Sequence, residues 1–354
     1  MNDMLMIDLG YSVIQQLGRF VSRDLAETQR TAFYPDVYDH EVECFRFVTR
    51  DMSLALVVPY VKANVETTDE ENIANMVYRI RVFLTRTLTA SRTLDTVSKL
   101  RVTHFLGSVH DIIILPKHLR SDQQMDKLFS KVPDIEDPIF LKNWIMTLRP
   151  LRDIYLSSFA ADSIYYPALD STPRYSASSQ SLLIPAGAIG FPYYSSELIS
   201  AINYGGLGYS TAKELVAALL SNPEKSWLSG TLSKTYTSRA KCLGTDIASY
   251  QGRSLGSTLV SFWDLAVGSW SLHSLYEAYK NDITDHPSRL ADAPQFSADQ
   301  LFFISVCYSM CTTANTLNAA LLCDVPLRQM REFSETFRCP WNSFMIATDT
   351  CETW

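Results

Sequence analysis

A run of apolar residues at helical spacing between residues 68 and 88 is the sequence feature that most restricts the fold. The run repeats about every 3.6 residues, so its members share one face of a helix, and that face must be buried. Thr68 and Glu71 form the pattern of a capping box at its start. The apolar positions are Ile73, Met76, Val77, Ile80, Phe83, Leu84 and Leu88. This part of the chain is therefore expected to be mostly helical.

Apolar positions at similar spacing predict further helices elsewhere. They cover residues 5–17, 42–65, 94–106, 138–156 and 300–322. Pro59 and Pro150 fall inside two of these segments. Each is expected to interrupt its helix, because proline has no amide proton to donate.

The composition changes near residue 160. Residues 160–200 are rich in Ser, Tyr, Pro and Gly and carry little charge. Within them, the apolar run Ser181–Ile184 is expected to be an edge strand that leads into an irregular loop. The run Asp111–Leu115 could be a short strand or the end of a helix. We therefore expect an α+β chain that is mainly helical.

The composition excludes several classes of protein. The chain of 354 residues is 47% hydrophobic and 19% charged, which is typical of a globular protein. Its net charge of −7 argues against non-specific binding to nucleic acid, which needs a basic face. No apolar run reaches the about 18 residues of a membrane-spanning helix, and the N-terminal segment lacks the pattern of a secretory signal.

Four segments stand in a fixed order in the second half of the chain. They are Arg174–Gly187, Asn203–Gly208, Phe262–Gly268, and the stretch from Gln300 to the terminal Trp354. Together they resemble the C-terminal half of the neprilysin family of zinc endopeptidases. The resemblance implies a thermolysin-like zincin domain with a small sheet over residues 146–354. It also implies that residues 1–145 belong to the family's second, chamber-forming helical domain.

In that family, two histidines at positions i and i+4 of one helix and a glutamate of a second helix hold the catalytic zinc. The resemblance places Lys213 and Ala217 at the histidine positions and Trp263 at the glutamate position. An ammonium group has no lone pair, and a methyl group cannot bind a metal. None of the six histidines stands four residues from another, so no second pair of this kind exists. We therefore expect no metal and no cofactor.

The residues that support the zinc ligands in the family are also replaced. Leu220 and Val267 stand at two carboxylate positions of that supporting layer. Glu214 is retained at the position of the general base. However, Thr211 and Glu214 also form a capping-box pattern, and we favour capping. The reason is that a general base without a metal-activated water has nothing to deprotonate.

The substrate side of the family site is altered as well. The family motif N-A-x-Y corresponds to Thr172, Pro173, Arg174 and Tyr175. Thr172 lacks the carboxamide that would hold a peptide backbone, and Pro173 lacks a backbone donor.

A family histidine that stabilises an oxyanion, and an arginine that binds the substrate carboxylate, would lie between Asp324 and Cys339. This stretch is shorter than the family pattern. Arg328 and Arg331 lie in it, and we expect both to be solvated surface residues.

Seven cysteines is an odd number, so one is expected to be free or linked outside the chain. By resemblance, Cys242 pairs with Cys351. Cysteines that match family cysteines with partners in the absent N-terminal half are Cys44, Cys311 and Cys339. Cys307 and Cys323 have no family counterpart, and the sequence leaves their pairing open.

The resemblance implies a catalytically inactive homologue of a zinc endopeptidase, with peptides or another protein chain as its partner. Two alternatives stay open, namely an active zinc enzyme with substituted ligands and a decayed copy without selected activity. Family members are typically about twice this length, so we expect a C-terminal portion that results from truncation, an incomplete gene prediction or gene reduction. The family implies an extracellular or cell-surface location, whereas the chain as written shows no route there.

Overall fold

The computed structural model describes residues 2–33, 40–116, 119–134, 137–157, 170–221, 231–251, 260–282, 289–291, 293–311, 316–347 and 350–354. The chain separates into two compact units. The first unit comprises residues 1–59 and 116–167, and the second comprises residues 60–115 and 168–354. The expected boundary near residue 145 concerns the two domains of the family, and it stays a prediction.

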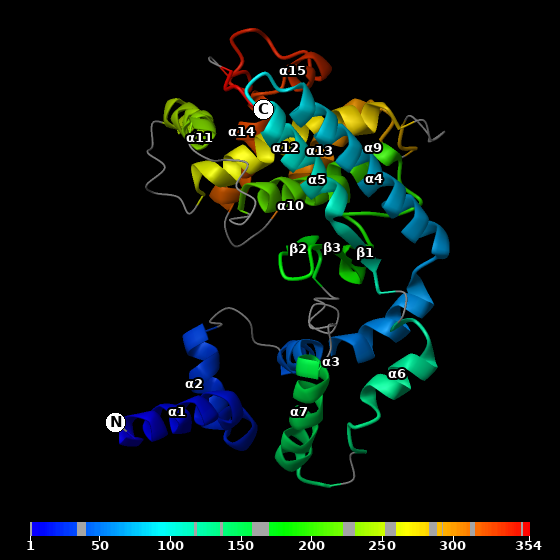
Figure 1. Cartoon of the computed structure of the whole chain (residues 1–354), viewed down its shortest axis with the longest axis vertical. Helices are drawn as coiled ribbons and strands as arrows, with labels where there is room; N and C mark the ends of the chain where they lie inside the picture. Colours follow the sequence, from blue (N-terminus) through cyan, green and yellow to red (C-terminus); the bar gives the residue numbers. More distant parts are fainter. Residues whose placement is uncertain are drawn as a thin grey trace. The chain divides into compact units, whose positions relative to one another are not determined.

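Helices make up most of both units, as Figure 1 shows. Those of the first unit are α1 (Asn2–Val21), α2 (Arg23–Phe33), α6 (Asp122–Phe129) and α7 (Phe140–Ser157), and α3 (His40–Asn64) continues from the first unit into the second. Those of the second unit are α4 (Thr67–Ala90), α5 (Thr96–Ser108), η2 (Ala186–Ala188), α9 (Ser200–Asn203), η3 (Tyr204–Gly208), α10 (Tyr209–Ser221), α11 (Thr231–Gln251), α12 (Phe262–Lys280), α13 (Ala298–Tyr308), α14 (Thr316–Arg328) and α15 (Arg331–Thr336). The prediction of a mainly helical α+β chain is confirmed.

The helix predicted from the apolar run is α4, but its N-terminal cap differs from the prediction. The backbone amide of Glu66 donates to the Asp69 carboxylate at 3.2 Å, and these two residues form the capping box. The predicted pair of Thr68 and Glu71 is wrong, because the helix begins at Thr67 and Asp69 is therefore its third residue.

Neither predicted proline interruption occurs. Pro59 lies inside α3 and Pro150 lies inside α7. The non-helical backbone within α3 is at Met52, with φ −133° and ψ 33°. A proline removes one helix hydrogen bond, and burial of neighbours such as Val57 and Val58 can hold the rest of the helix. The single helix predicted over residues 300–322 is also wrong, because the segment forms two helices, α13 and α14.

The described strands form one small sheet. They are β1 (His110–Ile114), β2 (Arg174–Ser176) and β3 (Ser181–Pro185), in the order β1-β3-β2. β1 runs parallel to β3, and β2 runs antiparallel to it with Tyr175 opposite Leu182. The prediction that residues 181–184 form an edge strand is wrong. Every residue of β3 is buried, and an apolar run without polar alternation is typical of such a central strand.

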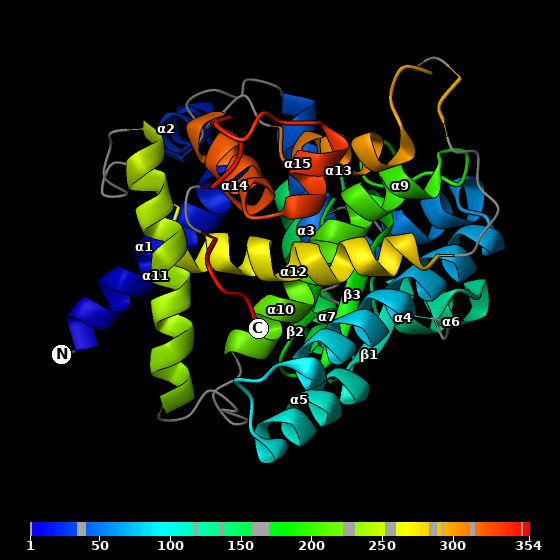
Figure 2. The same ribbon diagram turned by 90° about the horizontal axis from the view of Figure 1, so that it is seen from above.

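Helix α12 lies at the centre of the second unit, where it packs against α4, α10, α11 and α14 (Figure 2). Buried residues occur on all sides of α12, which is the pattern of a helix surrounded by other elements. The core beside it includes Trp270, Phe302 and Tyr236, each with no exposed surface. Among the described helices, none has the length and hydropathy that crossing a membrane requires.

Candidate functional site

Asn203 starts the segment that carries the candidate site. Its side-chain oxygen accepts a hydrogen bond from the Ser195 amide at 3.0 Å, and its side-chain nitrogen donates to the Ser195 carbonyl at 2.8 Å. The Leu207 amide donates to the Tyr193 carbonyl at 2.8 Å. These bonds hold the start of the helical segment, including the π-helix η3 that leads directly into α10, against residues 193–195.

Two glycines of η3 lie where no side chain fits. A Cβ at Gly205 would overlap the carbonyl oxygen of Phe302 in α13, and a Cβ at Gly206 would overlap the carbonyl oxygen of Tyr193. The glycines allow the backbone of η3 to pack directly on its neighbours. The position of α10 therefore depends on this glycine pair.

Lys213 and Ala217, the two expected histidine positions, lie one turn apart on α10 and are both partly exposed. The Lys213 ammonium lies 5.4 Å from the centroid of the Tyr209 ring, within the range of a cation–π contact. Burial lowers the pKa of Lys213, while the negative charges of Glu214 and Asp264 act in the opposite direction. The Lys213 ammonium therefore lies on the helix face where the resemblance places the zinc ligands.

Glu214 does not cap a helix. Since η3 continues into α10, Thr211 and Glu214 lie inside a helical segment and not at its start. A cap supplies acceptors to the first amides of a helix, which have no partner in a preceding turn. The amides near Thr211 and Glu214 follow the turns of η3, so the capping prediction is wrong. The Glu214 carboxylate instead accepts a hydrogen bond of 3.1 Å from the backbone amide of Tyr175 in β2.

The surroundings of Glu214 affect its charge in two directions. Burial raises the pKa of Glu214 above its usual value. The Tyr175 amide and the positive charges of Lys213 and Arg174 act to lower it. The carboxylate is therefore a partly buried acceptor that is held by a backbone donor and affected by the charges of two cations.

Trp263 and Val267 lie in the first turns of α12. The helix starts with a capping box in which the Asp264 amide donates to the Ser261 hydroxyl at 3.1 Å and the Ser261 amide donates to the Asp264 carboxylate at 2.8 Å. Next to this cap, the Trp263 ring meets Trp270 edge-on, with 6.1 Å between the ring centroids. Trp263 is therefore part of an aromatic cluster.

Zinc, which the family uses, does not fit the side chains at these positions. Helices α10 and α12 pack against each other, so the elements that carry the positions are neighbours. However, Lys213, Ala217 and Trp263 offer no lone pair for a zinc ion. In the part of the chain that the structure describes, no three His, Cys, Asp or Glu side chains form a group that could hold a metal. The assignment of these positions to the zinc ligands stays a prediction.

The supporting positions and the expected substrate strand have simple surroundings. Leu220 on α10 is partly exposed, as is Val267 on α12. Thr172 is exposed and Pro173 is buried, and both precede β2. Because Pro173 precedes the strand, its lack of a backbone amide proton removes no donor from β2 itself. Tyr175 lies inside β2.

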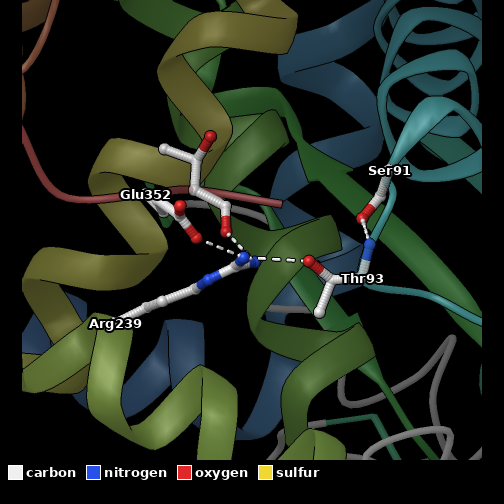
Figure 3. Close-up of polar contacts among 5 residues, drawn as sticks. Ser91, Thr93, Arg239 and Glu352 are labelled. Atoms are coloured by element: carbon white, nitrogen blue, oxygen red, sulfur yellow. Dashed lines mark hydrogen bonds and ion pairs between the residues drawn. The ribbon is translucent and has the colours of Figure 1, made fainter.

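Arg239 holds the C-terminal tail, a role that its sequence context does not indicate. Its guanidinium donates to the Thr353 carbonyl at 2.8 Å, to the Thr93 hydroxyl at 2.9 Å and to the Glu352 carboxylate at 2.6 Å (Figure 3). The Thr93 amide in turn donates to the Ser91 hydroxyl at 3.1 Å. The tail is thereby joined to α11 and to the segment after α4.

The last residues of the chain are held by two further contacts. Cys242 and Cys351 form a disulfide with their Cα atoms 5.9 Å apart, as the resemblance implies. The ring nitrogen of Trp354 donates to the Trp270 carbonyl at 3.1 Å. The C-terminal motif thus completes the packing around α12.

A second disulfide, between Cys307 and Cys323, joins α13 to α14 with a Cα–Cα distance of 5.0 Å. The sequence left this pairing open. The remaining free cysteines are Cys44, Cys311 and Cys339.

The two arginines between Asp324 and Cys339 differ in their surroundings. The expectation of a solvated surface holds for Arg331, whose side chain is 86% exposed and pairs with Glu335 at 2.6 Å. For Arg328 it is wrong, because this residue is only 6% exposed and its guanidinium lies 5.1 Å from the centroid of the Phe344 ring. The Ala347 amide also donates to the Arg328 carbonyl at 3.2 Å, so the chain beyond α15 returns to the end of α14.

Comparisons with known proteins agree with this arrangement. The sequence model of Peptidase family M13 matches residues 174–353, which include β2, α10, α12 and the C-terminal tail. The chain is 22% identical over 342 residues to endothelin-converting enzyme 1 of Rattus norvegicus, covering 88% of this chain and 44% of the relative. It is 22% identical over 393 residues to neprilysin of Homo sapiens, covering 98% of this chain and 51% of the relative. The chain spans about half the length of these relatives.

Solved structures show the same fold. A zinc metalloprotease of Mycobacterium tuberculosis in complex with an inhibitor superposes with a TM-score of 0.72 at 14% identity, over 97% of this chain and 56% of that chain. A Haemonchus galactose-containing glycoprotein complex gives a TM-score of 0.65 at 19% identity, over 83% of this chain and 51% of that chain. The fold and the adjacent helices α10 and α12 thus define the scaffold of a zinc-metallopeptidase homologue. More specifically, the chain belongs to Peptidase family M13.

Proposed function

We propose that this chain is a non-catalytic member of Peptidase family M13 that holds no catalytic zinc. The observation that carries the proposal is the hydrogen bond between the Glu214 carboxylate and the Tyr175 amide, 3.1 Å long. A general base must face the water that it deprotonates. One oxygen of the Glu214 carboxylate is engaged by the backbone of β2, and the side chains expected at the metal position offer no lone pair to a zinc ion that would activate a water for the other oxygen.

The charge at the expected metal position supports the same proposal. The Lys213 ammonium lies close enough to the Glu214 and Asp264 carboxylates for their charges to affect its pKa. A zinc ion placed there would meet a positive charge and would find no ligand at Ala217.

For a retained role, we propose the binding of an extended peptide or another protein chain without cleavage. The support is that β2 is one of the two outer strands of the described sheet, and outer strands carry backbone groups that another chain can pair with. A decayed copy without selected activity would bind no such partner. Calorimetric titration with extended peptides therefore separates these two possibilities.

Elemental analysis and a cleavage assay test the loss of catalysis. The purified chain is loaded with excess zinc, desalted and analysed, and a generic fluorogenic peptide is incubated with it with and without a chelator. We expect substoichiometric zinc and no chelator-sensitive cleavage. Stoichiometric zinc together with chelator-sensitive cleavage would overturn the proposal in favour of an enzyme with substituted ligands.

A further inference from the structure

The outer edge of β2 has one backbone donor that points away from the sheet. In an antiparallel pair, successive residues direct their backbone groups alternately toward the partner strand and away from it. The Tyr175 amide points to α10, so the groups of its neighbours Arg174 and Ser176 point toward β3. In a strand of three residues, Tyr175 is therefore the position at which another chain could pair.

Glu214 already occupies this donor. Its carboxylate oxygen lies 3.1 Å from the Tyr175 nitrogen, at the distance where the carbonyl oxygen of an added strand would accept. We propose that Glu214 is an internal occupant of the β2 edge, which weakens the pairing of an extended peptide with β2 because the carboxylate must first withdraw.

Two physical arguments favour Glu214 over an incoming peptide. A hydrogen bond to a carboxylate is stronger than one to a neutral carbonyl, so the peptide would exchange a strong acceptor for a weaker one. The Glu214 side chain is also part of the protein, so it competes at a high effective concentration. Yet Glu214 is partly exposed, so its flexible side chain can leave the edge for solvent without disturbing the core.

This inference rests on the proposed non-catalytic role, because it gives the Glu214 carboxylate a role other than the activation of water. The non-catalytic role and the occupied edge can still be refuted independently of each other. Zinc content and cleavage are measured on the wild-type chain, whereas occupancy of the edge is measured on variants of Glu214 in the presence of a chelator.

The test compares two variants that remove the contact with one that keeps it. Glu214→Ala deletes the acceptor, and Glu214→Asp draws the carboxylate back by one methylene. Glu214→Gln keeps an acceptor oxygen without the charge. Glu71→Ala on α4 is the matched control, because Glu71 is an exposed helical glutamate remote from β2 in the sequence. Thermal melts establish that each variant is folded.

Two measurements report on the edge. The first is hydrogen exchange of a peptide fragment that contains the Tyr175 amide. The second is fluorescence anisotropy with a blocked, labelled peptide of about ten residues that alternates threonine and valine between terminal lysines. A second peptide with proline at its central positions cannot pair with a strand and serves as the negative probe.

We expect Glu214→Ala and Glu214→Asp to raise the exchange rate of the Tyr175 amide at least tenfold and to bind the first peptide at least tenfold more tightly than wild type. Glu214→Gln is expected to fall between these variants and wild type, and Glu71→Ala is expected to match wild type. The inference is overturned if the folded variants leave exchange unchanged. It is equally overturned if exchange rises but peptide affinity does not, or if both peptides bind alike.

Discussion

The hydroxyl of Tyr209 on α10 lies against Gly268 on α12, so close that a Cβ at residue 268 would be 2.8 Å from the hydroxyl oxygen. Tyr209 is 1% exposed, and burial raises the pKa of its hydroxyl. The pair therefore limits how closely α10 and α12 approach. These are the helices that carry Lys213 and Trp263.

Gly268→Ala is expected to lower the free energy of unfolding by about 1–3 kcal/mol, since the added methyl group overpacks a filled contact. Gly107→Ala in α5 is the matched control, because no atom lies within 4 Å of its Cβ position. It should be neutral or stabilise by up to about 1 kcal/mol. Combining Gly268→Ala with Tyr209→Phe removes the clashing oxygen and should recover part of the loss. Urea unfolding of the four proteins measures these changes, and equal effects of the two glycine substitutions would contradict the contact.

Restoring the family ligands should restore zinc binding. In the triple variant Lys213→His, Ala217→His and Trp263→Glu, α10 would present two imidazoles one turn apart and α12 would supply a carboxylate. We expect at least a tenfold gain in zinc affinity over wild type in competition with a chromophoric chelator. Because Leu220 and Val267 still lack carboxylates, affinity should remain below that of a complete site by about 10–100-fold. If the triple variant folds but binds zinc no better than Lys213→His alone, the assignment of these positions is wrong.

The raised pKa of Glu214 predicts a dependence of stability on pH. The folded chain holds this proton more tightly than the unfolded chain, whose glutamate pKa is near the ordinary 4.5. The stability that this group contributes is thus complete below pH 4.5 and is lost as the pH rises through the folded pKa. Glu214→Gln has no such titration, so its stability relative to wild type should increase from pH 4.5 toward neutral pH. Urea unfolding at several pH values measures the difference, and a difference that is constant with pH would refute the prediction.

Arg239→Met should destabilise the chain by about 2 kcal/mol, because it removes hydrogen bonds to the Thr353 carbonyl and the Thr93 hydroxyl. Glu352→Gln is the matched control for the ion pair. The Glu352 side chain is 78% exposed, so its loss should cost less than about 0.5 kcal/mol. Thermal and urea unfolding test both values. If Glu352→Gln proves as costly as Arg239→Met, the ion pair and not the backbone contact holds the tail.

Disulfide mapping by mass spectrometry should find Cys307 joined to Cys323 and Cys242 joined to Cys351, with Cys44, Cys311 and Cys339 available for alkylation. Replacing both Cys307 and Cys323 by serine should lower stability by about 2–3 kcal/mol, because the link restricts the unfolded chain. Cys44→Ser should leave stability unchanged. Recovery of Cys311 in a disulfide with Cys323 would show a different pairing in this region.

The sequence by itself predicted most helices and the family, because both are encoded in local patterns. The spacing of apolar residues that identifies α4 and α5 requires no knowledge of distant contacts. The replacement of the family's ligands at Lys213, Ala217 and Trp263 is likewise a prediction from residue identities and motif order. Chemistry that depends on the presence of a lone pair is excluded at a position by its residue type alone.

Only the tertiary structure decided which partners these residues have. Glu214 bonds to an amide 39 residues away, whereas its local pattern with Thr211 suggested a cap. Arg239 holds a carbonyl 114 residues away, and nothing in α11 indicates it. β3 is central because β1 and β2 pair with its two sides, and the buried Arg328 guanidinium lies over the ring of Phe344. Such contacts depend on how remote segments pack, and a local sequence pattern carries no record of that packing.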